Sequence, residues 1–315
     1  MRVYAATNQD ARVRDMSTSG GVFLALCEST IQAGGAVYGA CFSDDMTVVH
    51  ERSTSMDGCR RFSGSKYVQS RLGDVFMQVR DDLLENRRVL FSGTPCQVAG
   101  LQSYLESERA SGDLLAVDLI CHGVPSPQLW ADHVALVSSA HGVRLRGFRF
   151  REKSVGWHGI NSVAMTGGEE IVDYLVGAFG ELYAAAVALR PSCHACVFAN
   201  MQRVGDITLG DFWGIEKCLP ERDCLMGVSI VLVSTPHGDD ALRSVAQRLD
   251  LDEVTVSGWQ QPSLCGPTLP SPKRSAFWKT YSRLGYEKAI KRFTSYGLLR
   301  RLVRTVRRSL KRRQR

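Results

Sequence analysis

The chain has 315 residues, of which 44% are hydrophobic and 23% are charged, and its net charge is +7. This length allows one large or two modest domains with packed cores, and the composition is that of a soluble globular protein. No apolar run approaches the ~20 residues that span a bilayer, and the first ten residues lack the apolar core of a signal peptide. We therefore expect a cytoplasmic protein whose ten cysteines are ligands or buried packing residues rather than disulfides.

Residues 16–42 predict a loop, a helix and a strand. The segment STSGG (residues 17–21) precedes the apolar start of the helix. A glycine-rich helix entry can bind phosphate through its free N–H groups, which makes Ser19, Gly20 and Gly21 candidates. An ordinary capped helix is the alternative reading, since short glycine motifs are weak signals.

Residues 62–70 form a polar loop that contains a single lysine, Lys66. This side chain can neutralise a pyrophosphate, or it is a solvated surface lysine. The other candidates of this region are three cysteines spaced 14 and 18 residues apart, Cys27, Cys41 and Cys59. That spacing does not suit a cluster, so we interpret them as packing residues.

The middle of the chain predicts a parallel sheet. Residues 74–85 read as an amphipathic helix. Two strands (88–92 and 114–120) then alternate with two helices (95–105 and 127–138), which is the pattern of parallel strands with helical crossovers. We expect an α/β protein with a mixed sheet.

Two cysteines follow these two strands. Thr94 can cap a helix and Pro95 suits its first turn, so Cys96 lies at a helix N-terminus that favours a thiolate. Cys121 follows the second strand. Because functional groups gather at the carboxyl ends of strands in open α/β sheets, we expect Cys96 and Cys121 at the same edge. His122 is either a hydrogen-bond donor or proton relay beside Cys121, or a residue that completes the turn.

Residues 144–172 alternate with period two and predict antiparallel strands. Their cations form either a basic face for an acidic protein or anionic substrate, or the solvated side of a sheet; they are Arg144, Arg146, Arg149, Arg151 and Lys153. Residues 173–189 predict an alanine-rich helix.

Residues 190–214 hold the pair Cys193 and Cys196, spaced C-x-x-C after Pro191. This spacing points two thiolates at one centre and is typical of a metal, cluster or redox site. A short buried strand follows at residues 204–211, and Trp213 comes at its end, where a flat ring can cover a cofactor.

One C-x-x-C supplies two of the four ligands that a tetrahedral metal or an iron–sulfur cluster usually takes. We therefore expect Cys96, Cys121, Cys193 and Cys196 to form one four-thiolate cage. A structural zinc site or a dithiol is the alternative interpretation.

The C-terminal part predicts a buried strand at residues 227–234 and a proline-rich linker at 266–275. Residues 273–315 hold 16 Lys or Arg and one acid, so their net charge is +15 and that of residues 1–272 is −8. Apolar residues at helical spacing predict an amphipathic cationic helix, which lies on an anionic membrane, docks on an acidic partner or is a solvated tail; they are Leu298, Leu299, Leu302, Val303, Val306 and Leu310. Nucleic acid binding is not expected, because no recognition motif accompanies the tail.

The motifs SGTPCQVAGL (92–101), DLICHGVPSP (118–127) and C-x-x-C followed by GDITLGDFWG (205–214) resemble the coenzyme F420-reducing hydrogenase/dehydrogenase beta-subunit family. STSGGVF (17–23) and GSKYVQS (64–70) resemble its N-terminal module. The resemblance covers about residues 10–265. It implies an iron–sulfur flavoprotein oxidoreductase that passes electrons between a 4Fe-4S cluster and FAD, and the four cysteines fall on the family's ligand positions. The implied fold has a small N-terminal α/β module (1–73) and a larger cluster- and flavin-binding domain (74–265), and the predicted linker and basic helical tail (266–315) follow them.

Several further expectations rest on the resemblance. The flavin-binding residues that it implies, together with the chemistry of the loops, are Ser19, Gly20, Gly21, Ser65, Lys66, Tyr67, Gln97, Asp206 and Asp211. Coenzyme F420 is a candidate substrate, and a surface-polysaccharide pathway is a candidate setting. The chain lacks the ferredoxin module C-x-x-C-x-x-C-x-x-x-C-P of many bacterial members, so a separate ferredoxin-like protein is the expected electron donor or acceptor.

Two other classes of protein stay open. In the first, Cys96 is the nucleophile and His122 the base of a thiol enzyme. In the second, the chain is a zinc-stabilised accessory protein of polysaccharide biosynthesis without redox chemistry. The expected location is the cytoplasm, with the inner face of the membrane as a site for the basic tail. Cys218, Cys224 and Cys265 lack C-x-x-C spacing and are weak candidates for a second cluster.

Overall fold

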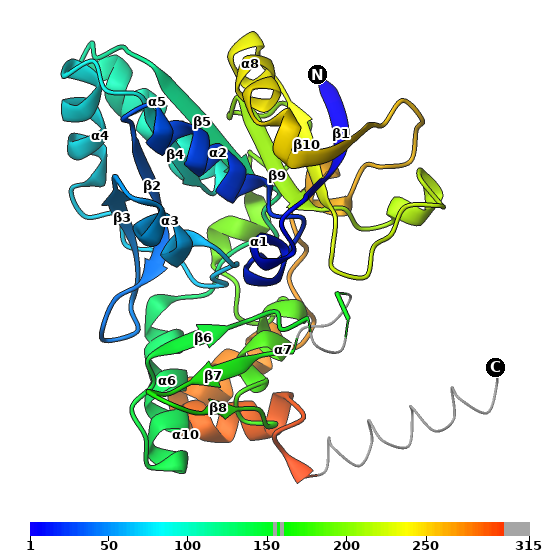
Figure 1. Ribbon diagram of the computed structural model, residues 1–315. Coiled ribbons are helices and arrows are strands. Elements are labelled where there is room, and N and C mark those ends of the chain that lie inside the picture. Colours follow the sequence, from blue (N-terminus) through cyan, green and yellow to red (C-terminus); the bar gives the residue numbers. More distant parts are fainter. Residues whose placement is uncertain (154–155, 158–160, 299–315) are drawn as a thin grey trace.

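The computed structural model describes residues 1–153, 156–157 and 161–298 (Figure 1). Within these residues, an eight-stranded mixed sheet has the order β11-β1-β10-β9-β5-β4-β2-β3, which confirms the predicted α/β class. Its strands are β1 (Arg2–Asn8), β2 (Ala36–Phe42), β3 (Val48–Ser53), β4 (Val89–Gly93), β5 (Leu114–Leu119), β9 (Ile207–Asp211), β10 (Ser229–Val233) and β11 (Leu249–Glu253). A small antiparallel sheet consists of β6 (Gly147–Arg149), β7 (Val163–Met165) and β8 (Glu170–Ile171).

Helices α2, α4, α5 and α6 begin at or next to the predicted positions. Both α5 and α6 have a proline in the first turn, directly after the capping residues Thr94 and Ser126. The α-helices are α1 (Ala11–Met16), α2 (Val22–Gln32), α3 (Met56–Phe62), α4 (Val75–Leu84), α5 (Pro95–Ser107), α6 (Pro127–His141), α7 (Ala178–Ala184), α8 (Pro236–Ser244), α9 (Pro262–Cys265) and α10 (Arg274–Phe293). Short 3-10 helices are η1 (Pro191–Ala195), η2 (Ile215–Lys217) and η3 (Ala246–Arg248).

Strands β2, β4, β5 and β9 run parallel to one another. Strand β3 pairs antiparallel with β2 at one side, and β10, β1 and β11 continue the sheet antiparallel at the other. The carboxyl ends of β4, β5 and β9 therefore meet at one edge of the sheet, where functional groups gather in open α/β folds.

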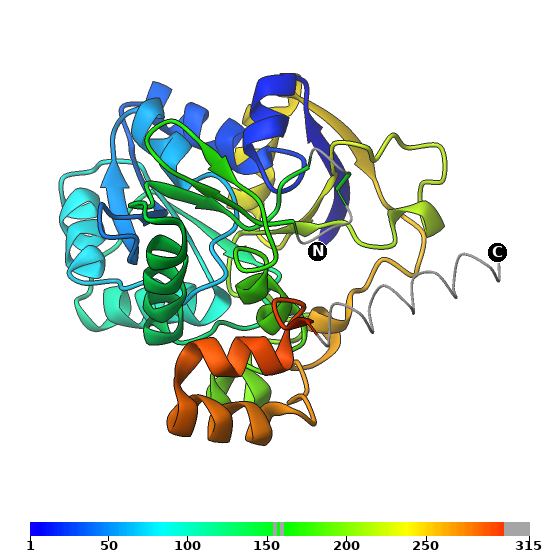
Figure 2. The same ribbon diagram turned by 90° about the horizontal axis from the view of Figure 1, so that it is seen from below.

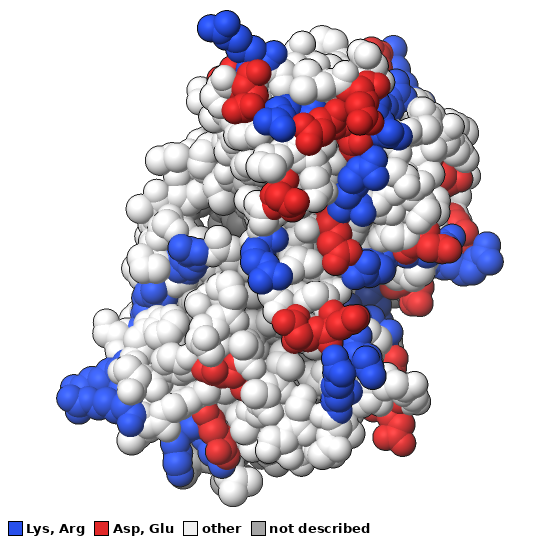
Figure 3. Space-filling model, turned by 90° about the vertical axis from the view of Figure 1, so that its left-hand side faces the viewer, with Lys and Arg blue, Asp and Glu red and all other residues white. Residues whose placement is uncertain are grey.

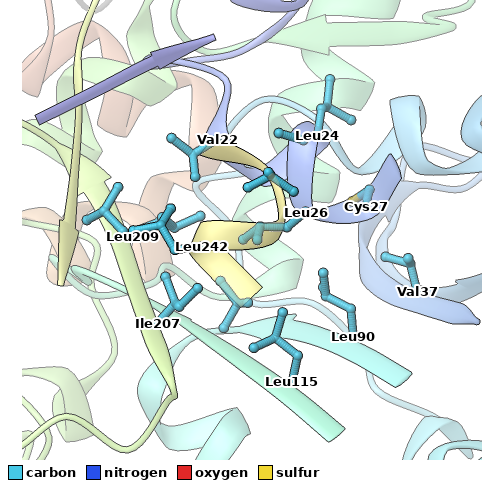
Figure 4. Packing of buried hydrophobic residues seen from close by; sticks show 14 of the residues in the cluster. Val22, Leu24, Leu26, Cys27, Val37, Leu90, Leu115, Ile207, Leu209 and Leu242 are labelled. Carbon is cyan, nitrogen blue, oxygen red and sulfur yellow. The ribbon is translucent and has the colours of Figure 1, made fainter. Parts of the chain in front are cut away.

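Alternate residues of each strand point to opposite faces of the large sheet. Helices pack on both faces and bury these side chains. Figure 4 shows one face, where Leu90, Leu115 and Ile207 pack against residues of α2 and against Leu242 of α8. The other face packs on α4 and α5 through residues such as Tyr38 and Phe91. The cysteines interpreted as packing residues, Cys27, Cys41 and Cys59, are fully buried in the first of these clusters.

A second hydrophobic core joins the small sheet to α6, α7 and α10. Figure 1 shows this layer below the large sheet, and Figure 2 shows it from its own side. At its centre the fully buried Trp130 of α6 donates from Nε1 to the Met46 carbonyl at 2.6 Å. The Trp130 ring also contacts Phe148, Phe150 and Phe179 at centroid distances of 5.0 to 5.2 Å.

The helix predicted over residues 173–189 is too long, since α7 covers only Ala178–Ala184. Before it, Asp173 Oδ1 accepts from the Val176 N–H at 2.7 Å, which is a local turn that competes with helix. After it, Ala186 has φ +52°, a left-handed conformation that ends a helix. Leu189 then pairs with Pro125 in an isolated β-bridge.

The last described segment also differs from a simple linker and tail. Helix α10 begins at Arg274, inside the predicted linker, and buries Phe277, Tyr286 and Ile290 in the second core. Of the apolar residues predicted to form the cationic amphipathic helix, Leu298 is described and exposed, and the other five lie outside the described residues. Every helix in the described ranges is too short or too polar to cross a lipid bilayer.

The division into residues 1–73, 74–265 and 266–315 stays a proposal. Strands β1, β2 and β3 come from the first of these parts, yet they pair in one sheet with strands of the second. The first boundary therefore runs through a continuous sheet.

Replacing Trp130 should unfold the second core first. We expect Trp130→Ala to lower the free energy of unfolding by about 3–5 kcal/mol, because it removes a buried aromatic side chain and leaves a cavity. Trp130→Phe should cost less, since it mainly leaves the Met46 carbonyl without its donor. Urea unfolding followed by near-ultraviolet circular dichroism measures both, and an unchanged midpoint for Trp130→Ala would contradict this account.

Candidate cofactor and metal site

The four predicted metal ligands come from three segments at the carboxyl edge of the sheet. Cys96 lies in the first turn of α5, after β4, and Cys121 follows β5. Cys193 lies in η1 and Cys196 directly follows it. Burial, together with the nearby thiols of Cys96, Cys193 and Cys196, raises the pKa of the Cys121 thiol to about 12. The structure thus brings all four thiols near one another, and we call this set the cysteine site.

One buried ion pair holds the loop of residues 190–203, the two-cysteine loop, against the sheet. Arg203 Nη2 donates to Asp118 Oδ2 at 2.9 Å, and the two side chains are 1% and 0% exposed. The same guanidinium donates from Nη1 to the carbonyls of Phe198 at 3.1 Å and Asn200 at 3.0 Å. Because Asp118 belongs to β5, this pair sets where the loop lies relative to the strand that leads to Cys121.

Residues Gly123 and Val124 complete the contact between Cys121 and the two-cysteine loop. The Val124 N–H donates to Cys193 Sγ at 3.4 Å. Gly123 has φ +124°, and a Cβ at this position would lie 3.0 Å from Leu189 Cδ1 and 3.1 Å from Cys193 Cβ. A glycine is therefore needed here for both the backbone conformation and the close approach.

Cys96 has a partner of its own, since Thr94 Oγ1 lies 3.2 Å from Cys96 Sγ. Within the described residues, no group of three or more His, Cys, Asp or Glu side chains could hold a metal ion as the side chains stand. A mononuclear zinc site would draw four sulfurs to about 2.3 Å from one point. Four thiolates are the donor set of a 4Fe-4S cluster, and Cys96, Cys121, Cys193 and Cys196 would supply it.

Two histidines flank the cysteine site and meet at one threonine. Thr268 Oγ1 donates to the His122 carbonyl at 2.7 Å and lies 3.2 Å from His122 Nδ1. His194 Nδ1 donates to the Thr268 carbonyl at 2.7 Å. Thr268 thus links the Cys121 turn to the two-cysteine loop. No property of the sequence singled out this threonine.

A cleft of about 940 Å³ opens at the same edge of the sheet. Of the sequence-predicted residues, those that line it are Ser19, Gly21, Ser65, Lys66, Tyr67, Cys96, Gln97, Cys193 and Asp211. The cleft and the cysteine site therefore share Cys96 and Cys193. Its size and position are those of a cofactor site in an α/β protein.

The glycine-rich segment before α2 supplies one wall of the cleft. Gly21 has φ +85° and directly precedes the helix. Gly20 lies beneath the wall, because a Cβ there would stand 2.1 Å from the Ala6 carbonyl oxygen. Ser19 Oγ donates to the Val228 carbonyl at 2.8 Å, and Thr18 Oγ1 accepts from the Ser65 N–H at 2.7 Å. The segment thus joins β10 to the loop that carries Lys66.

Lys66 is half-buried in this wall and bonds only to backbone in the described contacts. Its Nζ donates to the carbonyls of Ser63 at 2.7 Å and Arg61 at 2.9 Å. Burial lowers the pKa of the Lys66 ammonium from 10.5 to about 7. An anionic ligand in the cleft would relieve this cost of desolvation.

Two predicted flavin-binding residues have structural partners instead. Gln97 Oε1 accepts from the Thr94 N–H at 3.0 Å, and its Nε2 donates to Ser70 Oγ at 2.8 Å. Asp206 precedes β9, at the edge opposite the cleft, where it accepts from the Ala116 N–H at 2.9 Å and from Thr235 Oγ1 at 2.6 Å. Gln97 lines the cleft with its polar atoms engaged, and the structure does not bring Asp206 to the cleft.

Asp211, at the end of β9, is the centre of an aromatic and charged group. Its Oδ2 accepts from Arg151 Nη1 at 2.9 Å and its Oδ1 from Trp157 Nε1 at 3.1 Å. Trp157 stacks on Trp213 at a centroid distance of 4.7 Å, and the Arg151 guanidinium lies 4.8 Å from the Trp213 ring centre. Arg151 is only 6% exposed, so it belongs to the cleft wall rather than to a solvated basic face.

Lys153 also differs from the solvated face expected for its strand. It is 7% exposed, and its Nζ donates to the carbonyls of Arg14, Ser19 and Met226 at 2.7 to 2.9 Å. The segment after β6 is thereby tied to the glycine-rich wall of the cleft.

Tyr183 of α7 is a cleft residue that the sequence did not single out. Its ring stacks on Tyr67 at a centroid distance of 4.1 Å and an angle of 6°. The ring centroids of His122 and Tyr183 are 5.1 Å apart, and the two ring planes meet at 66°. Burial raises the pKa of both tyrosines, so both hydroxyls stay protonated at neutral pH. The rings of Tyr67, Tyr183 and His122 thus form a row that leads from the cleft to the turn that carries Cys121.

Breaking the Asp118–Arg203 pair should release the two-cysteine loop. We expect Arg203→Met to lower the free energy of unfolding by about 3–5 kcal/mol, because it leaves a buried carboxylate without its partner. The double variant Asp118→Leu/Arg203→Met should be more stable than Arg203→Met, since it removes both charges. Urea unfolding measures the stability of the parent protein, of Arg203→Met and of the double variant. Equal stability of Arg203→Met and the parent protein would show that the pair contributes nothing.

The lowered pKa of Lys66 predicts a pH dependence. Between about pH 7 and 10.5 the unfolded chain keeps a proton that the folded chain has released, so the free energy of unfolding should rise with pH in this window. Lys66→Met should remove this part of the rise, whereas Lys279→Met, at an exposed site on α10, should leave it. Urea unfolding at several pH values compares the slopes; the same slope in the parent and in Lys66→Met would refute the assignment.

Comparisons with known proteins agree with the motifs. The family model that describes the C terminus of the beta subunit of coenzyme F420 hydrogenase/dehydrogenase matches residues 86–257, which is more than half of the chain. No curated protein matches the chain.

A chain in the xenon-derivatised structure of the F420-reducing NiFe hydrogenase complex from Methanosarcina barkeri has a similar fold. Its TM-score is 0.56 at 14% sequence identity, and the match covers 92% of this chain and 90% of that chain. The family match confirms the family that the motifs indicated and suggests an oxidoreductase role. The chain therefore belongs to the coenzyme F420 hydrogenase/dehydrogenase beta-subunit family.

Proposed function

We propose that this chain is an iron–sulfur flavoprotein that passes electrons between a 4Fe-4S cluster and FAD and thereby reduces or oxidises a small substrate. The observation that carries this proposal is the gathering of four thiols from three segments beside a large cleft. Cys96, Cys121, Cys193 and Cys196 would hold the cluster. When bound, the cluster supplies single-electron transfer and the flavin supplies two-electron chemistry.

The cleft residues suit a dinucleotide flavin. The backbone at Gly21 opens the eleven-residue helix α2, whose N-terminus favours phosphate. Lys66 adds a cation on the same side of the cleft. Tyr67, Tyr183 and Trp213 offer flat rings against which a planar ring system can pack.

Arg151 and Asp211 neutralise each other in the cleft wall, with side chains 6% and 14% exposed. The Gln261 amide also donates to the Asp211 carbonyl at 2.5 Å, which holds the end of β9 in place. This rigid group would position the flavin or its substrate and exclude water, rather than exchange protons with them.

The contacts of the described residues favour this reading over a thiol enzyme. A nucleophilic cysteine needs a base within hydrogen-bond reach. Here Cys96 Sγ contacts Thr94 Oγ1, while the His122 ring contacts Thr268 and Tyr183. The zinc-stabilised accessory protein of polysaccharide biosynthesis is the second alternative. The metal content of the purified protein separates this alternative from the iron–sulfur flavoprotein.

The substrate and the partners form the rest of the proposal. Coenzyme F420 is the candidate substrate that the family description suggests. The similar chain comes from a multi-subunit hydrogenase complex, which favours an external protein as donor or acceptor of single electrons. A cytoplasmic location, with the basic tail at the inner membrane face, and a role in a surface-polysaccharide pathway stay predictions.

Anaerobic reconstitution tests the assignment directly. We expect about four iron atoms per chain and bound FAD, with visible absorbance from both. Cys193→Ser should lose the iron, because it removes one of the four ligands. Cys265→Ser is the control: Cys265 is exposed to solvent and lies outside the cysteine site, and its variant should keep the iron. A colourless protein that binds zinc and no flavin would rule out the redox function.

A further inference from the structure

The outer side of the two-cysteine loop carries an exposed apolar surface. Val197, which directly follows Cys196, is 76% exposed, and Leu269 is 79% exposed. Pro191, at the start of the same loop as Val197, and Pro270, next to Leu269, are also exposed. We call Pro191, Val197, Leu269 and Pro270 the apolar rim.

The two halves of the apolar rim are held together although they lie far apart in the chain. His194 Nδ1 donates to the Thr268 carbonyl at 2.7 Å, which joins the two-cysteine loop to the residue before Leu269. Thr268 Oγ1 in turn donates to the His122 carbonyl. The rim is therefore built on the same contacts that surround the cysteine site, and its exposure is a fixed feature of this surface.

The apolar rim borders the cleft, because Arg190 and Ser192 on either side of Pro191 line it. Cys96 and Cys193 line the cleft, whereas none of the four rim residues lines it. A protein bound at the rim would therefore approach the cysteines without entering the cleft. The cleft stays open for the flavin and its substrate.

The segments that form the rim carry positive charge only. Residues 189–204 and 266–275 contain four cations and no Asp or Glu. Arg203 is paired with Asp118 in the interior, while Arg190 and Lys273 are exposed. Arg274 lies near Cys193. On the face shown in Figure 3, in contrast, Lys and Arg alternate with Asp and Glu.

We propose that the apolar rim is the docking surface for a small acidic electron-carrier protein. This inference rests on the proposed function and names the surface through which the cysteine site meets its partner. Interfaces of electron-transfer complexes are small, below about 1,200 Å², so a few apolar contacts suffice. The flanking cations steer an acidic partner to the rim and reject a basic one.

Binding of an acidic bacterial ferredoxin with two 4Fe-4S clusters tests the proposal. Calorimetry with the full-length reconstituted protein should detect binding that weakens between about 0.02 M and about 0.15 M salt, because screening increases. Val197→Glu and Leu269→Glu should each weaken binding by about tenfold or more, since they place a carboxylate on the apolar contact and face an acidic partner.

The control is Leu84→Glu. Leu84 is 62% exposed at the end of α4, just before β4 and so at the opposite edge of the sheet. Its variant should bind ferredoxin within about twofold of the parent protein, as expected for a surface change outside an interface. Equal binding by the two rim variants and the parent, no binding by the parent, or equally tight binding of a basic cytochrome c would each overturn the proposal.

Iron and flavin content, measured for every variant, separates a failure of the docking surface from a failure of the proposed function. Weak binding by rim variants that keep full iron and flavin supports the docking surface. A parent protein without iron and flavin refutes the proposed function, whatever the ferredoxin binds. A parent with both cofactors and rim variants that bind normally refutes only the docking surface.

Discussion

The buried ion pair between Asp118 and Arg203 is the interaction on which the cysteine site depends. Asp118 lies in β5, and the Arg203 guanidinium also bonds to the carbonyls of Phe198 and Asn200 and to Thr208 Oγ1 of β9. One side chain therefore joins two neighbouring strands to the loop that brings two of the four thiols. Desolvating both charges is costly, so the pair is better understood as a device that sets the position of this loop than as a source of stability.

The direction of the parallel strands determines where the rest of the site lies. Because β4, β5 and β9 end at the same edge, the cysteine site and the cleft form side by side and share Cys96 and Cys193. Two buried cations then attach the segment after β6 to this edge, Arg151 through Asp211 and Lys153 through three backbone carbonyls. The cleft thus has walls from the N-terminal segment, the strand ends and the small-sheet region.

The strands and helices around the cysteines could be predicted because their signals are local. Hydrophobic runs, a capping threonine and a proline identify β4, α5, β5 and α6 almost residue by residue. Other cleft residues carry no such signal. Arg151 alternates like a solvated strand residue, Tyr183 lies in an ordinary alanine-rich segment, and Asp206 shares its Gly-Asp context with Asp211. Only the pairing of β9 shows that Asp206 and Asp211 lie at opposite edges of the sheet.

The sequence by itself determined the α/β class, the family, the strand that precedes each of Cys96 and Cys121, and the C-x-x-C spacing of Cys193 and Cys196, because these depend on residue type and short-range order. Tertiary structure alone decided that Cys96, Cys193 and Cys196 lie near Cys121, that Arg203 fixes the loop that carries two of these cysteines, and that His194 of this loop bonds to Thr268, 74 residues away. Such contacts depend on strand order and on the burial of charged groups. Both arise only when distant segments exclude water together, so no local pattern encodes them.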